Sequence, residues 1–402
     1  MKTERRHVAL FRNDLGGESV LFQNPRELII AEEPGELLPG LERAEQAQRD
    51  GLWVAGYISY EAGYLLDPAL TDLLPSQRDC PLLVLGAFDA PDTTYELQTD
   101  VICPPRLWNA QATWDMEAYR PRFTQLHQHL ARGDCFQGNL TFPIHAKWGG
   151  DPIALFHLLA KTQPVRHSAF IDLHGPTVLS RSPELFFSVS RSGWIETLPM
   201  KGTMPRGSTP EEDEAHRKHL RRDPKIQAEN RMIVDLLRND MSRISEAGSV
   251  DVPDLFEVQT YPTLHQMVSR IRAKLRPDTG LMEIMHALFP CGSITGAPKI
   301  SAMRILRQLE DTPRGVYCGA IGWAAPDGTM MFNVAIRTMS LFADGRATYN
   351  VGGGVILDST AEAEYDECLL KAQSIARHCD GGIKRSPARY PPEVLSGVVH
   401  PA

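Results

Sequence analysis

Hydrophobic and polar positions divide the chain into two differently patterned parts. Residues 1–105 alternate short apolar runs, typical of strands, with one helical stretch that ends before Gly51, a residue suited to closing a helix. Residues 115–379 instead show longer helices, glycine turns and apolar strands. Residues 380–402 are rich in glycine and proline, and we expect a flexible tail there. The first part predicts strands at His7–Phe11, Ser19–Phe22, Trp53–Tyr60 and Leu82–Ala87 and a helix at Leu37–Gln48.

A carboxylate lies on the apolar stripe of a helix predicted at Ala228–Asp240. Glu229 shares one helical face with Met232 and Leu236, three and seven residues further along. A carboxylate on such a face is costly unless a cation compensates its charge. Two interpretations stay open at this point. Glu229 is either a site residue or a glutamate at the edge of the stripe that reaches solvent or pairs with an arginine.

A second acidic helix follows the glycine-rich strand end at Gly352–Gly354. Ser359 and Glu362 have the spacing of a capping box, which predicts that the helix begins there. Glu364 and Glu367 then lie one turn apart on a common face. Two carboxylates so placed can hold Mg²⁺ and leave positions for substrate oxygens. An ordinary acidic first turn that complements the helix dipole would show the same sequence.

Small residues precede a third predicted helix in the segment Phe289–Lys299, which contains Thr295. Pro298 suits the first helical position, and free N–H groups at such a helix start can bind an anion. The spacing does not fit a nucleotide-binding P-loop, because no Gly-Lys-Ser/Thr follows the four-residue gap. A tight turn without a ligand is the alternative.

Two residues in predicted strands are candidate anion ligands. Tyr317 lies in the strand-like run Arg314–Trp323, and Arg337 lies in the apolar strand Phe332–Thr338. An arginine within an apolar strand needs a carboxylate partner. A substrate carboxylate held by two parallel hydrogen bonds would supply one, and so would a structural salt bridge.

A glutamate and a lysine could perform acid and nucleophilic chemistry. Glu184 follows a proline and precedes an apolar strand, so we expect its side chain to point inward. Lys201 precedes Gly-Thr on a predicted short loop. Burial or a neighbouring charge can lower the pKa of a lysine enough to make it nucleophilic, whereas most loop lysines are simply solvated.

Composition limits the class of protein. The chain has 402 residues, 42% of them hydrophobic, and a formal net charge of −8. This charge argues against a general binder of nucleic acids or anionic membranes. We find no signal peptide and no apolar run long enough to cross a membrane. The seven cysteines include no Cys-x-x-Cys pair, which favours reduced thiols in the cytoplasm over disulfides or a zinc site.

Taken in order, these segments resemble the chorismate-utilising enzymes, a family that includes anthranilate, aminodeoxychorismate, isochorismate and salicylate synthases. The resemblance runs from about Gly133 to Ala372. It rests on seven markers in the same order: Gly133–Thr141, Ser182–Glu184, Pro199–Thr203, Ala228–Asp240, Gly292–Lys299, Ala335–Thr338 and Glu362–Glu367.

The resemblance implies an α+β fold like that of anthranilate synthase component I. In this fold two large antiparallel sheets pack together, helices lie outside, and the site lies between the sheets. Residues 1–105 would then belong to the same body as a chorismate-binding catalytic core at residues 115–379.

The resemblance also implies a set of site residues. It implies Mg²⁺ held by Glu229 and Glu367, with Glu364 close by. It implies that a metal and an arginine neutralise a dicarboxylate inside an acidic protein. The implied catalytic residues are Lys201, Glu184 and His265. Tyr317 and Arg337 would contact the pyruvyl carboxylate of the substrate. Further substrate contacts would come from Gln137, Gly202, Thr203, Thr295 and Gly352–Gly354.

Two positions distinguish the subfamilies. Gln137 stands where isochorismate and salicylate synthases have a water-activating lysine, so addition of water is disfavoured. Lys201 stands where anthranilate synthases usually have alanine and where aminodeoxychorismate synthases have lysine. The chain therefore looks like component I of an aminodeoxychorismate synthase, with ammonia from a separate glutamine amidotransferase. Anthranilate synthase component I and 2-amino-2-deoxyisochorismate synthase are the alternatives. Gly138 and Ile226 depart from the family pattern.

Overall fold

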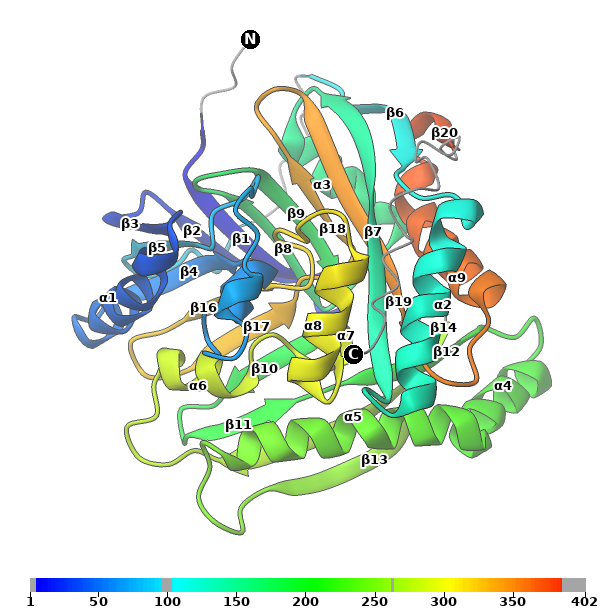
Figure 1. The fold of residues 1–402 in the computed structure, drawn as a ribbon. Coiled ribbons are helices and arrows are strands. Elements are labelled where there is room, and N and C mark those ends of the chain that lie inside the picture. Colours follow the sequence, from blue (N-terminus) through cyan, green and yellow to red (C-terminus); the bar gives the residue numbers. More distant parts are fainter. Residues whose placement is uncertain (1–4, 96–102, 262–263, 385–402) are drawn as a thin grey trace, which may run out of the picture.

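Two large β-sheets form the body of the protein in the computed structural model, which describes residues 5–95, 103–261 and 264–384 (Figure 1). The first sheet has the strand order β2-β1-β8-β9-β18-β19-β7-β6-β20, and β15 pairs with β7. Its strands are β1 (Val8–Asn13), β2 (Glu18–Gln23), β6 (Arg106–Ala112), β7 (Gln137–Gly149), β8 (His167–Asp172), β9 (Thr177–Ser182), β15 (Gly296–Ala297), β18 (Thr338–Leu341), β19 (Arg346–Val355) and β20 (Cys379–Lys384).

The second sheet has the strand order β12-β14-β11-β10-β17-β16-β4-β5-β3, and β13 pairs with β14. Among the described pairs, only β6 and β20 are parallel. The strands of the second sheet are β3 (Glu27–Ala31), β4 (Trp53–Ile58), β5 (Leu83–Phe88), β10 (Leu185–Val189), β11 (Trp194–Thr197), β12 (Met200–Pro205), β13 (Asp251–Thr260), β14 (Leu264–Lys274), β16 (Ala320–Ala324) and β17 (Met330–Val334).

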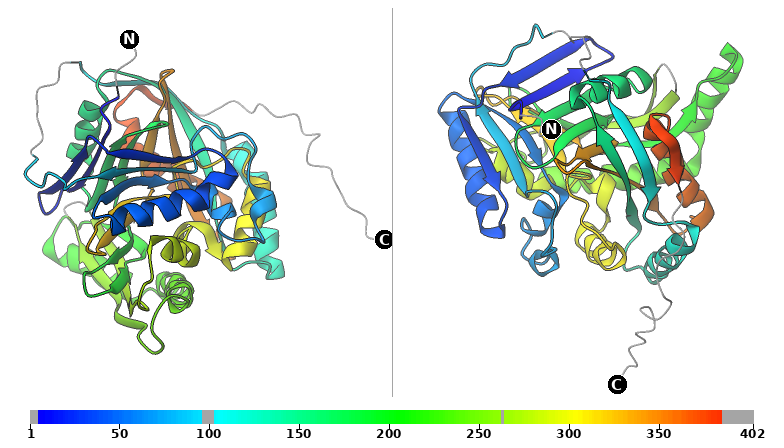
Figure 2. Two further views of the ribbon diagram at one scale, coloured as in Figure 1. Left: turned by 90° about the vertical axis from the view of Figure 1, so that its left-hand side faces the viewer. Right: turned by 90° about the horizontal axis from the view of Figure 1, so that it is seen from above.

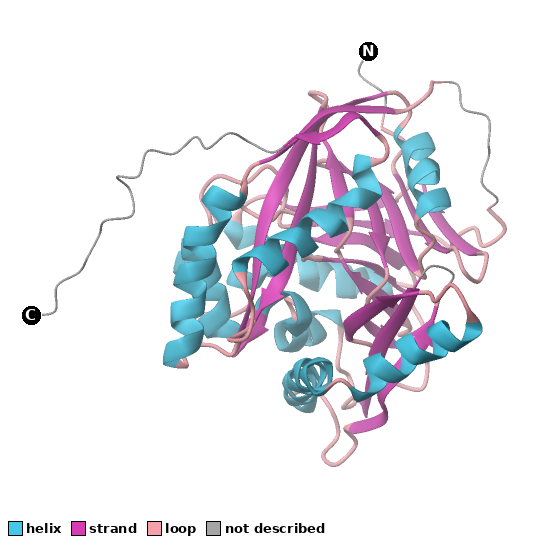
Figure 3. Ribbon diagram, turned by 90° about the vertical axis from the view of Figure 1, so that its right-hand side faces the viewer, coloured by secondary structure: helices cyan, strands magenta, loops and turns pink. Residues whose placement is uncertain are grey.

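Helices cover the outer faces of both sheets, as Figure 3 shows. The described helices are α1 (Leu37–Arg49), α2 (Met116–Arg132), α3 (Pro152–Thr162), α4 (Pro210–Arg222), α5 (Pro224–Ser242), α6 (Leu281–Leu288), α7 (Gly292–Thr295), α8 (Lys299–Leu309) and α9 (Ala361–Ala376), with 3₁₀ turns at Pro34–Glu36, Tyr60–Tyr64 and Thr71–Leu73. Apolar residues of α2, α3, α8 and α9 pack on the first sheet, and those of α1, α5 and α6 pack on the second.

Strand alternation explains how the two sheets share one interior. In β1, Ala9 and Phe11 point toward the second sheet, whereas Leu10 belongs to the core under the helices. In β4, Ala55 and Tyr57 meet them from the other side. Because successive side chains in a strand point to opposite faces, a strand buried on both faces must be apolar throughout. The two sheets and their helices can be followed in Figure 2.

The N-terminal residues build into both sheets. β1 and β2 extend the first sheet beside β8, and β3, β4 and β5 extend the second beside β16. The expected two-sheet α+β architecture is thus present, and residues 5–95 form no separate layer.

The described part of the C-terminal region departs from the expectation at its start. Residues 380–384, which we expected to belong to a flexible tail, form most of β20 and pair with β6. Asp380 also forms an ion pair with Arg106, with 2.7 Å between Oδ2 and Nη2. The rest of the expected tail, residues 385–402, lies outside the described residues.

Substitution at the interface between the sheets tests this architecture. Ile171 of β8 is fully buried there. We expect Ile171→Ala to lower the free energy of unfolding by about 3 kcal/mol, because it leaves a cavity between two rigid sheets. Urea unfolding measures this change. Leu255→Ala, at an exposed leucine of β13, should change it by less than about 0.5 kcal/mol. Similar losses from both variants would contradict the proposed interior.

Candidate active site

Two chain crossings between the sheets carry a candidate acid and a candidate anion ligand. The chain passes from β9 to β10 through Glu184, and from β17 to β18 through Arg337. Backbone hydrogen bonds join the crossings: Val334 N donates to Glu184 O at 3.1 Å, and Arg181 N donates to Arg337 O at 3.0 Å. The two side chains are therefore brought together where the sheets meet.

Glu184 is buried, as its position after a proline and before an apolar strand predicted. Its side chain is only 5% exposed, and Ser293 Oγ donates a hydrogen bond of 2.7 Å to its Oε1. Burial raises the pKa of Glu184 to about 7. The Ser293 hydrogen bond and the cations Lys201, Arg337 and Lys371 act in the opposite direction. A carboxyl group in this state can donate a proton near neutral pH.

Arg337 lies between two strands and not within one, which corrects the predicted strand at Phe332–Thr338. Its φ of 50° is in the left-handed region, where the backbone turns between the sheets. Burial lowers the pKa of Arg337, and Tyr349 and Glu184 oppose that effect. Within the described residues its guanidinium makes no hydrogen bond or ion pair. The structural salt bridge considered for this arginine is therefore not found in that part of the chain.

Lys201 is part of β12 and not of a loop, which corrects the sequence interpretation. The pairing of β12 with β14 is irregular between Met200 and Thr203, so Lys201 lies in a bulge. Burial lowers the pKa of Lys201, against the attraction of Glu229 and Glu184. In the described structure no side chain forms an ion pair with its amine.

Gly354 marks the point where Lys201 and Gln137 converge. A methyl group added at Gly354 would lie 3.2 Å from Lys201 Nζ and 2.9 Å from Gln137 Nε2. Gln137 is 1% exposed, and neither its Nε2 nor its Oε1 has a hydrogen-bond partner among the described residues. A buried amide without partners is unusual and requires an explanation such as a ligand or water.

His265 does not lie with this group, in contrast to the role implied by the resemblance. Its ring nitrogens contact Asp213 Oδ1 at 2.9 Å and Thr260 Oγ1 at 3.0 Å. The next residue of β14, Gln266, points to the opposite face. Gln266 Nε2 donates to Gly202 O, and Gln266 Oε1 accepts from Thr203 Oγ1, both at 2.9 Å. The period-two alternation of a strand directs the glutamine, and not the histidine, to the side where it contacts Gly202 and Thr203.

Tyr317 and Thr295 approach the same region from other elements. Tyr317 is buried, and burial raises its pKa well above the usual value. Cys318 N donates to Ala335 O at 2.9 Å, which holds Tyr317 beside the crossing that carries Arg337. Thr295 is fully buried at the end of α7, where its Oγ1 donates to Cys291 O at 3.2 Å.

The predicted metal ligands Glu229, Glu364 and Glu367 are close enough for their charges to affect one another's pKa. They are not close enough together to form a metal site. Burial raises the pKa of Glu229 and of Glu364, and Glu367 raises both further. Burial acts in the same sense on Glu367, but Lys371, 2.8 Å from its Oε1, holds its pKa below the usual value. Across the described residues, no three His, Cys, Asp or Glu side chains are grouped closely enough to hold a metal.

The start of α9 differs from the predicted capping box. The capping residue is Thr360, whose side chain accepts a hydrogen bond from Ala363 N. Ser359 instead donates to Glu364 Oε1 at 2.6 Å and so fixes that carboxylate. The other oxygen of Glu364 lies close enough to Gly353 that a β-carbon there would be only 2.8 Å away. A larger residue at this position would therefore displace the carboxylate of Glu364 where β19 passes the acidic helix.

Several residues of this cluster were not predicted. Ser293 lies within the Gly292–Lys299 marker, yet only the fold shows that its hydroxyl reaches Glu184. Lys371 was missed although its spacing of four residues from Glu367 is that of a helical ion pair. Gln266 could have been found by fixing the inward face of β14 from its alternation.

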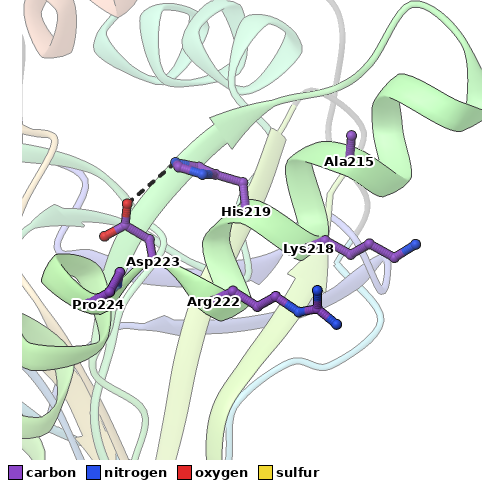
Figure 4. A pocket seen from close by; sticks show the side chains of 6 residues that line it. All are labelled: Ala215, Lys218, His219, Arg222, Asp223 and Pro224. Carbon is purple, nitrogen blue, oxygen red and sulfur yellow. Dashed lines mark ion pairs between the residues drawn. The ribbon is translucent and has the colours of Figure 1, made fainter.

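Two surface hollows lie near α5. One, of about 500 Å³, is lined by Ala215, Lys218, His219, Arg222, Asp223 and Pro224, and Figure 4 shows His219 directed toward Asp223 across it. The other, of about 700 Å³, is lined by Phe136, Ala228, Arg231, Met232, Asp235, Leu236, Asn239, Ala297 and Pro298. Neither is lined by Glu184, Lys201 or Arg337.

Comparison with known proteins places this geometry in a family. The family model of chorismate binding enzymes matches residues 7–377. The chain belongs to the chorismate-binding enzymes. This confirms the resemblance based on the seven markers. No helix in the described ranges is both long and apolar enough to cross a membrane.

Relatives and solved structures of this family give a finer comparison. Aminodeoxychorismate synthase component 1 of Klebsiella aerogenes is 42% identical over 265 residues, which cover 66% of this chain and 58% of the relative. Aminodeoxychorismate synthase of Streptomyces griseus is 42% identical over 266 residues, covering 66% and 37%. The chain thus matches about three fifths of the first relative and a smaller share of the second.

The solved structure of anthranilate synthase component I from Streptococcus pneumoniae TIGR4 confirms the fold. It superimposes with a TM-score of 0.76 at 25% identity and covers 93% of this chain and 92% of the other. The predicted α+β fold, with two packed antiparallel sheets and helices outside, is therefore correct.

The hydrogen bond from Ser293 can be tested by the ionisation of Glu184. Because this bond favours the charged carboxylate, we expect Ser293→Ala to move the pKa of Glu184 from about 7 to a higher value. Infrared titration of the protonated carboxyl band, assigned with Glu184→Gln, measures the midpoint. Ser293→Thr, which keeps a hydroxyl, should remain near the wild type. A lower midpoint in Ser293→Ala would show that the bond does not act on Glu184.

Proposed function

We propose that this chain is the chorismate-aminating component of an aminodeoxychorismate synthase, which serves 4-aminobenzoate and folate synthesis. The supporting observation is the amine of Lys201, which has a lowered pKa, has no ion-pair partner in the described structure and faces Gly354 beside Gln137. A lysine in this state is uncharged more often than a solvated one and can act as a nucleophile. The 42% sequence identity to a relative named for this activity supports the same proposal.

The proposed substrate contacts follow from the unpaired groups. Arg337 would bind the pyruvyl carboxylate through two hydrogen bonds, with Tyr317 beside it. Gln137 would use its free amide, and Thr295 would face the substrate from α7. The backbone of Gly202, Thr203 and Gly352–Gly354 would line the site, since glycines let a ligand approach the main chain closely.

The proposed reaction exchanges a hydroxyl for an amino group in two substitutions. Lys201 Nζ forms a bond to ring C2, the ring double bonds shift, and the C4–oxygen bond breaks. The proton of Glu184 passes to the leaving oxygen, which departs as water. Ammonia then bonds to C4, the double bonds shift back and the C2–Nζ bond breaks. Glu184 recovers a proton from the new ammonium group, so the products are 4-amino-4-deoxychorismate and water.

In this proposal Mg²⁺ would be held by Glu229, Glu364 and Glu367, whose carboxylates would have to draw together around the ion. Burial raises the pKa of Glu229 and of Glu364 against the attraction of nearby lysines, so a divalent cation would favour their charged forms further, and hard oxygen donors are those that Mg²⁺ prefers. The ion would balance the charge of the ring carboxylate.

For His265 we retain no role at the ring, because its contacts are with Asp213 and Thr260.

Ammonia would come from a separate glutamine amidotransferase. The component 1 designation of the Klebsiella relative supports a second component in that enzyme, and we extend this arrangement to the present chain.

A cytoplasmic location is part of the same proposal, supported by the seven unpaired cysteines.

Replacement of the nucleophile tests the covalent step. We expect Lys201→Ala to lower formation of aminodeoxychorismate from chorismate, Mg²⁺ and ammonium on the order of 100-fold or more. Mass analysis of the product measures this. It also distinguishes the proposed product, which retains the pyruvyl group, from anthranilate, whose formation releases pyruvate. Lys218→Ala makes the same change of residue at an exposed lysine of α4 and should have no effect. Undiminished product from Lys201→Ala would eliminate the lysine adduct.

Metal binding can be measured without turnover. We expect Mg²⁺ titration calorimetry to show binding to the wild type and at least ~10-fold weaker binding to Glu229→Gln, which loses one charged ligand. Glu362→Gln is the matched control, because this exposed glutamate of α9 pairs with Arg120 instead. EDTA should abolish product formation by the wild type. Activity that persists in EDTA would count against the metal proposal.

A further inference from the structure

Arg314 is a buried arginine that the proposed reaction does not use. It lies between the end of α8 and Tyr317, and its side chain is 2% exposed. Its Nε and Nη2 donate hydrogen bonds of 2.9 and 2.7 Å to the two carboxylate oxygens of Glu310, and its guanidinium lies 4.3 Å from the ring centre of Tyr60. Because Glu310 already balances its charge, Arg314 is not an anion ligand, and its other donors can bind uncharged groups.

The other donors of Arg314 bind the main chain of two segments that carry proposed substrate contacts. Nη1 donates to Ile294 O at 2.9 Å, and Nη2 also donates to Asn139 O at 2.7 Å. The carbonyl of Ile294 belongs to the same planar peptide group as the nitrogen of Thr295. Asn139 lies two residues after Gln137 in β7. A single guanidinium, whose donors have fixed directions, therefore holds the segment of Thr295 at a set distance from that of Gln137.

Arg314 and Glu310 together take the place of a neighbouring strand along one edge of β7. In the described structure β6 pairs with residues 144–149 of β7, and β15 pairs with residues 137–138. Between these stretches Thr141 N donates to Glu310 Oε1 at 3.1 Å, two residues from the carbonyl that Arg314 Nη2 binds. Groups two residues apart in a strand point to the same edge, so the ion pair supplies the donor and the acceptor that a strand would supply. Figure 1 shows α7 and α8 beside β7 here.

The main chain of Arg314 is fixed as well, and this holds the segment that carries Tyr317. Arg314 N donates to Glu61 Oε1 at 2.7 Å, and Gly315 N donates to Glu61 Oε2 at 3.0 Å. Glu61 is itself buried in the 3₁₀ turn that follows β4. In addition, Asn350 Nδ2 of β19 donates to Arg314 O at 3.0 Å. The chain that leads to Tyr317, three residues further on, therefore begins from a fixed position.

We propose that Arg314 is a positioning residue of the chorismate site, which holds Gln137, Thr295 and Tyr317 at the spacing that the substrate requires. The proposal rests on the proposed function, which assigns these three residues to the substrate. They come from β7, from α7 and from the chain after α8, and the contacts of Arg314 join all three segments.

Substitution of Arg314 by lysine tests this proposal through substrate affinity. Arg314→Lys keeps the positive charge, but a lysine amine cannot reach Glu310 and two carbonyls in the fixed directions of a guanidinium. We expect the Kd for chorismate, measured by calorimetry with Mg²⁺ and without ammonia, to rise on the order of 10-fold or more. The KM should rise by a similar factor. The kcat at saturating chorismate should stay near the wild-type value, because Arg314 does not bind Lys201 or Glu184.

A second variant makes the test independent of a change at Arg314 itself. Glu61→Gln keeps the size of the side chain, but its amide nitrogen cannot accept a hydrogen bond from Gly315 N. We expect the Kd for chorismate to rise about 3-fold or more, since one buried hydrogen bond to the main chain is lost. If Arg314→Lys does not fold, the Kd of Glu61→Gln decides the question.

Arg122→Lys is the matched control. Arg122 also binds a carboxylate, that of Asp311, and two carbonyls, those of Ala118 and Leu309, and its guanidinium lies over the ring of Trp114. These carbonyls belong to α2 and α8 and to no segment with a proposed substrate contact. We expect Arg122→Lys to lower the midpoint of thermal unfolding, as Arg314→Lys does, without a change in Kd or KM.

The outcomes separate positioning from folding and from the proposed function. An unchanged Kd and KM in folded Arg314→Lys and Glu61→Gln would refute the positioning role, and so would an equal rise of Kd in Arg122→Lys. A lower apparent kcat at unchanged KM, with a reduced binding stoichiometry, would also refute it, because a smaller folded fraction gives that result. A wild type that binds chorismate but forms no aminodeoxychorismate with ammonium would refute the proposed function, and the comparison of Kd values would still decide the positioning role.

Discussion

Two backbone hydrogen bonds between the chain crossings hold the site together. The bonds from Val334 N to Glu184 O and from Arg181 N to Arg337 O tie the β9–β10 passage to the β17–β18 passage. Each sheet is built on hydrogen-bonded ladders of its own, so these passages have little freedom to move. The carboxyl group of Glu184 and the guanidinium of Arg337 are thus fixed by main-chain geometry, and the remaining site groups are arranged around them.

The charges of the site differ from the other buried charges of the protein. Arg314 has its guanidinium satisfied by Glu310 at 2.7 Å and lies over the ring of Tyr60, and Arg181 is paired with Asp14. In the described structure Lys201 and Arg337 have no such partners. Buried ion pairs of this kind have a structural role. A buried charged group without a partner is costly, and it is retained where a ligand supplies the opposite charge. This contrast, more than the net charge of −8, supports the proposed anion-binding position.

The sequence predicted the fold and the family because ordered markers and hydrophobic periodicity are properties of the chain itself. The helix expected at Ala228–Asp240 is the central part of α5, and the inward direction of Glu184 follows from its place before β10. The errors arose where tertiary geometry decides. The role of His265 came from the resemblance alone, and Gln266 was not considered because only the fold shows that its amide contacts Gly202 and Thr203. The left-handed turn at Arg337 and the capping of α9 by Thr360 likewise depend on contacts from distant segments.

The order of strands in the first sheet has a consequence for synthesis on the ribosome. One margin of this sheet is formed by β2 and β1, which are made first, and the other by β20, which is made last in the described chain. Until β20 emerges, β6 presents an open row of amide and carbonyl groups that can pair with any extended polypeptide nearby. The pairing of β20 with β6 joins segments that are far apart in the sequence, with a separation of 274 residues between the ion-paired Arg106 and Asp380, and such long-range pairing is intrinsically slow. A nascent polypeptide of this kind is exposed to aggregation during translation, and chaperone protection is most valuable in that interval.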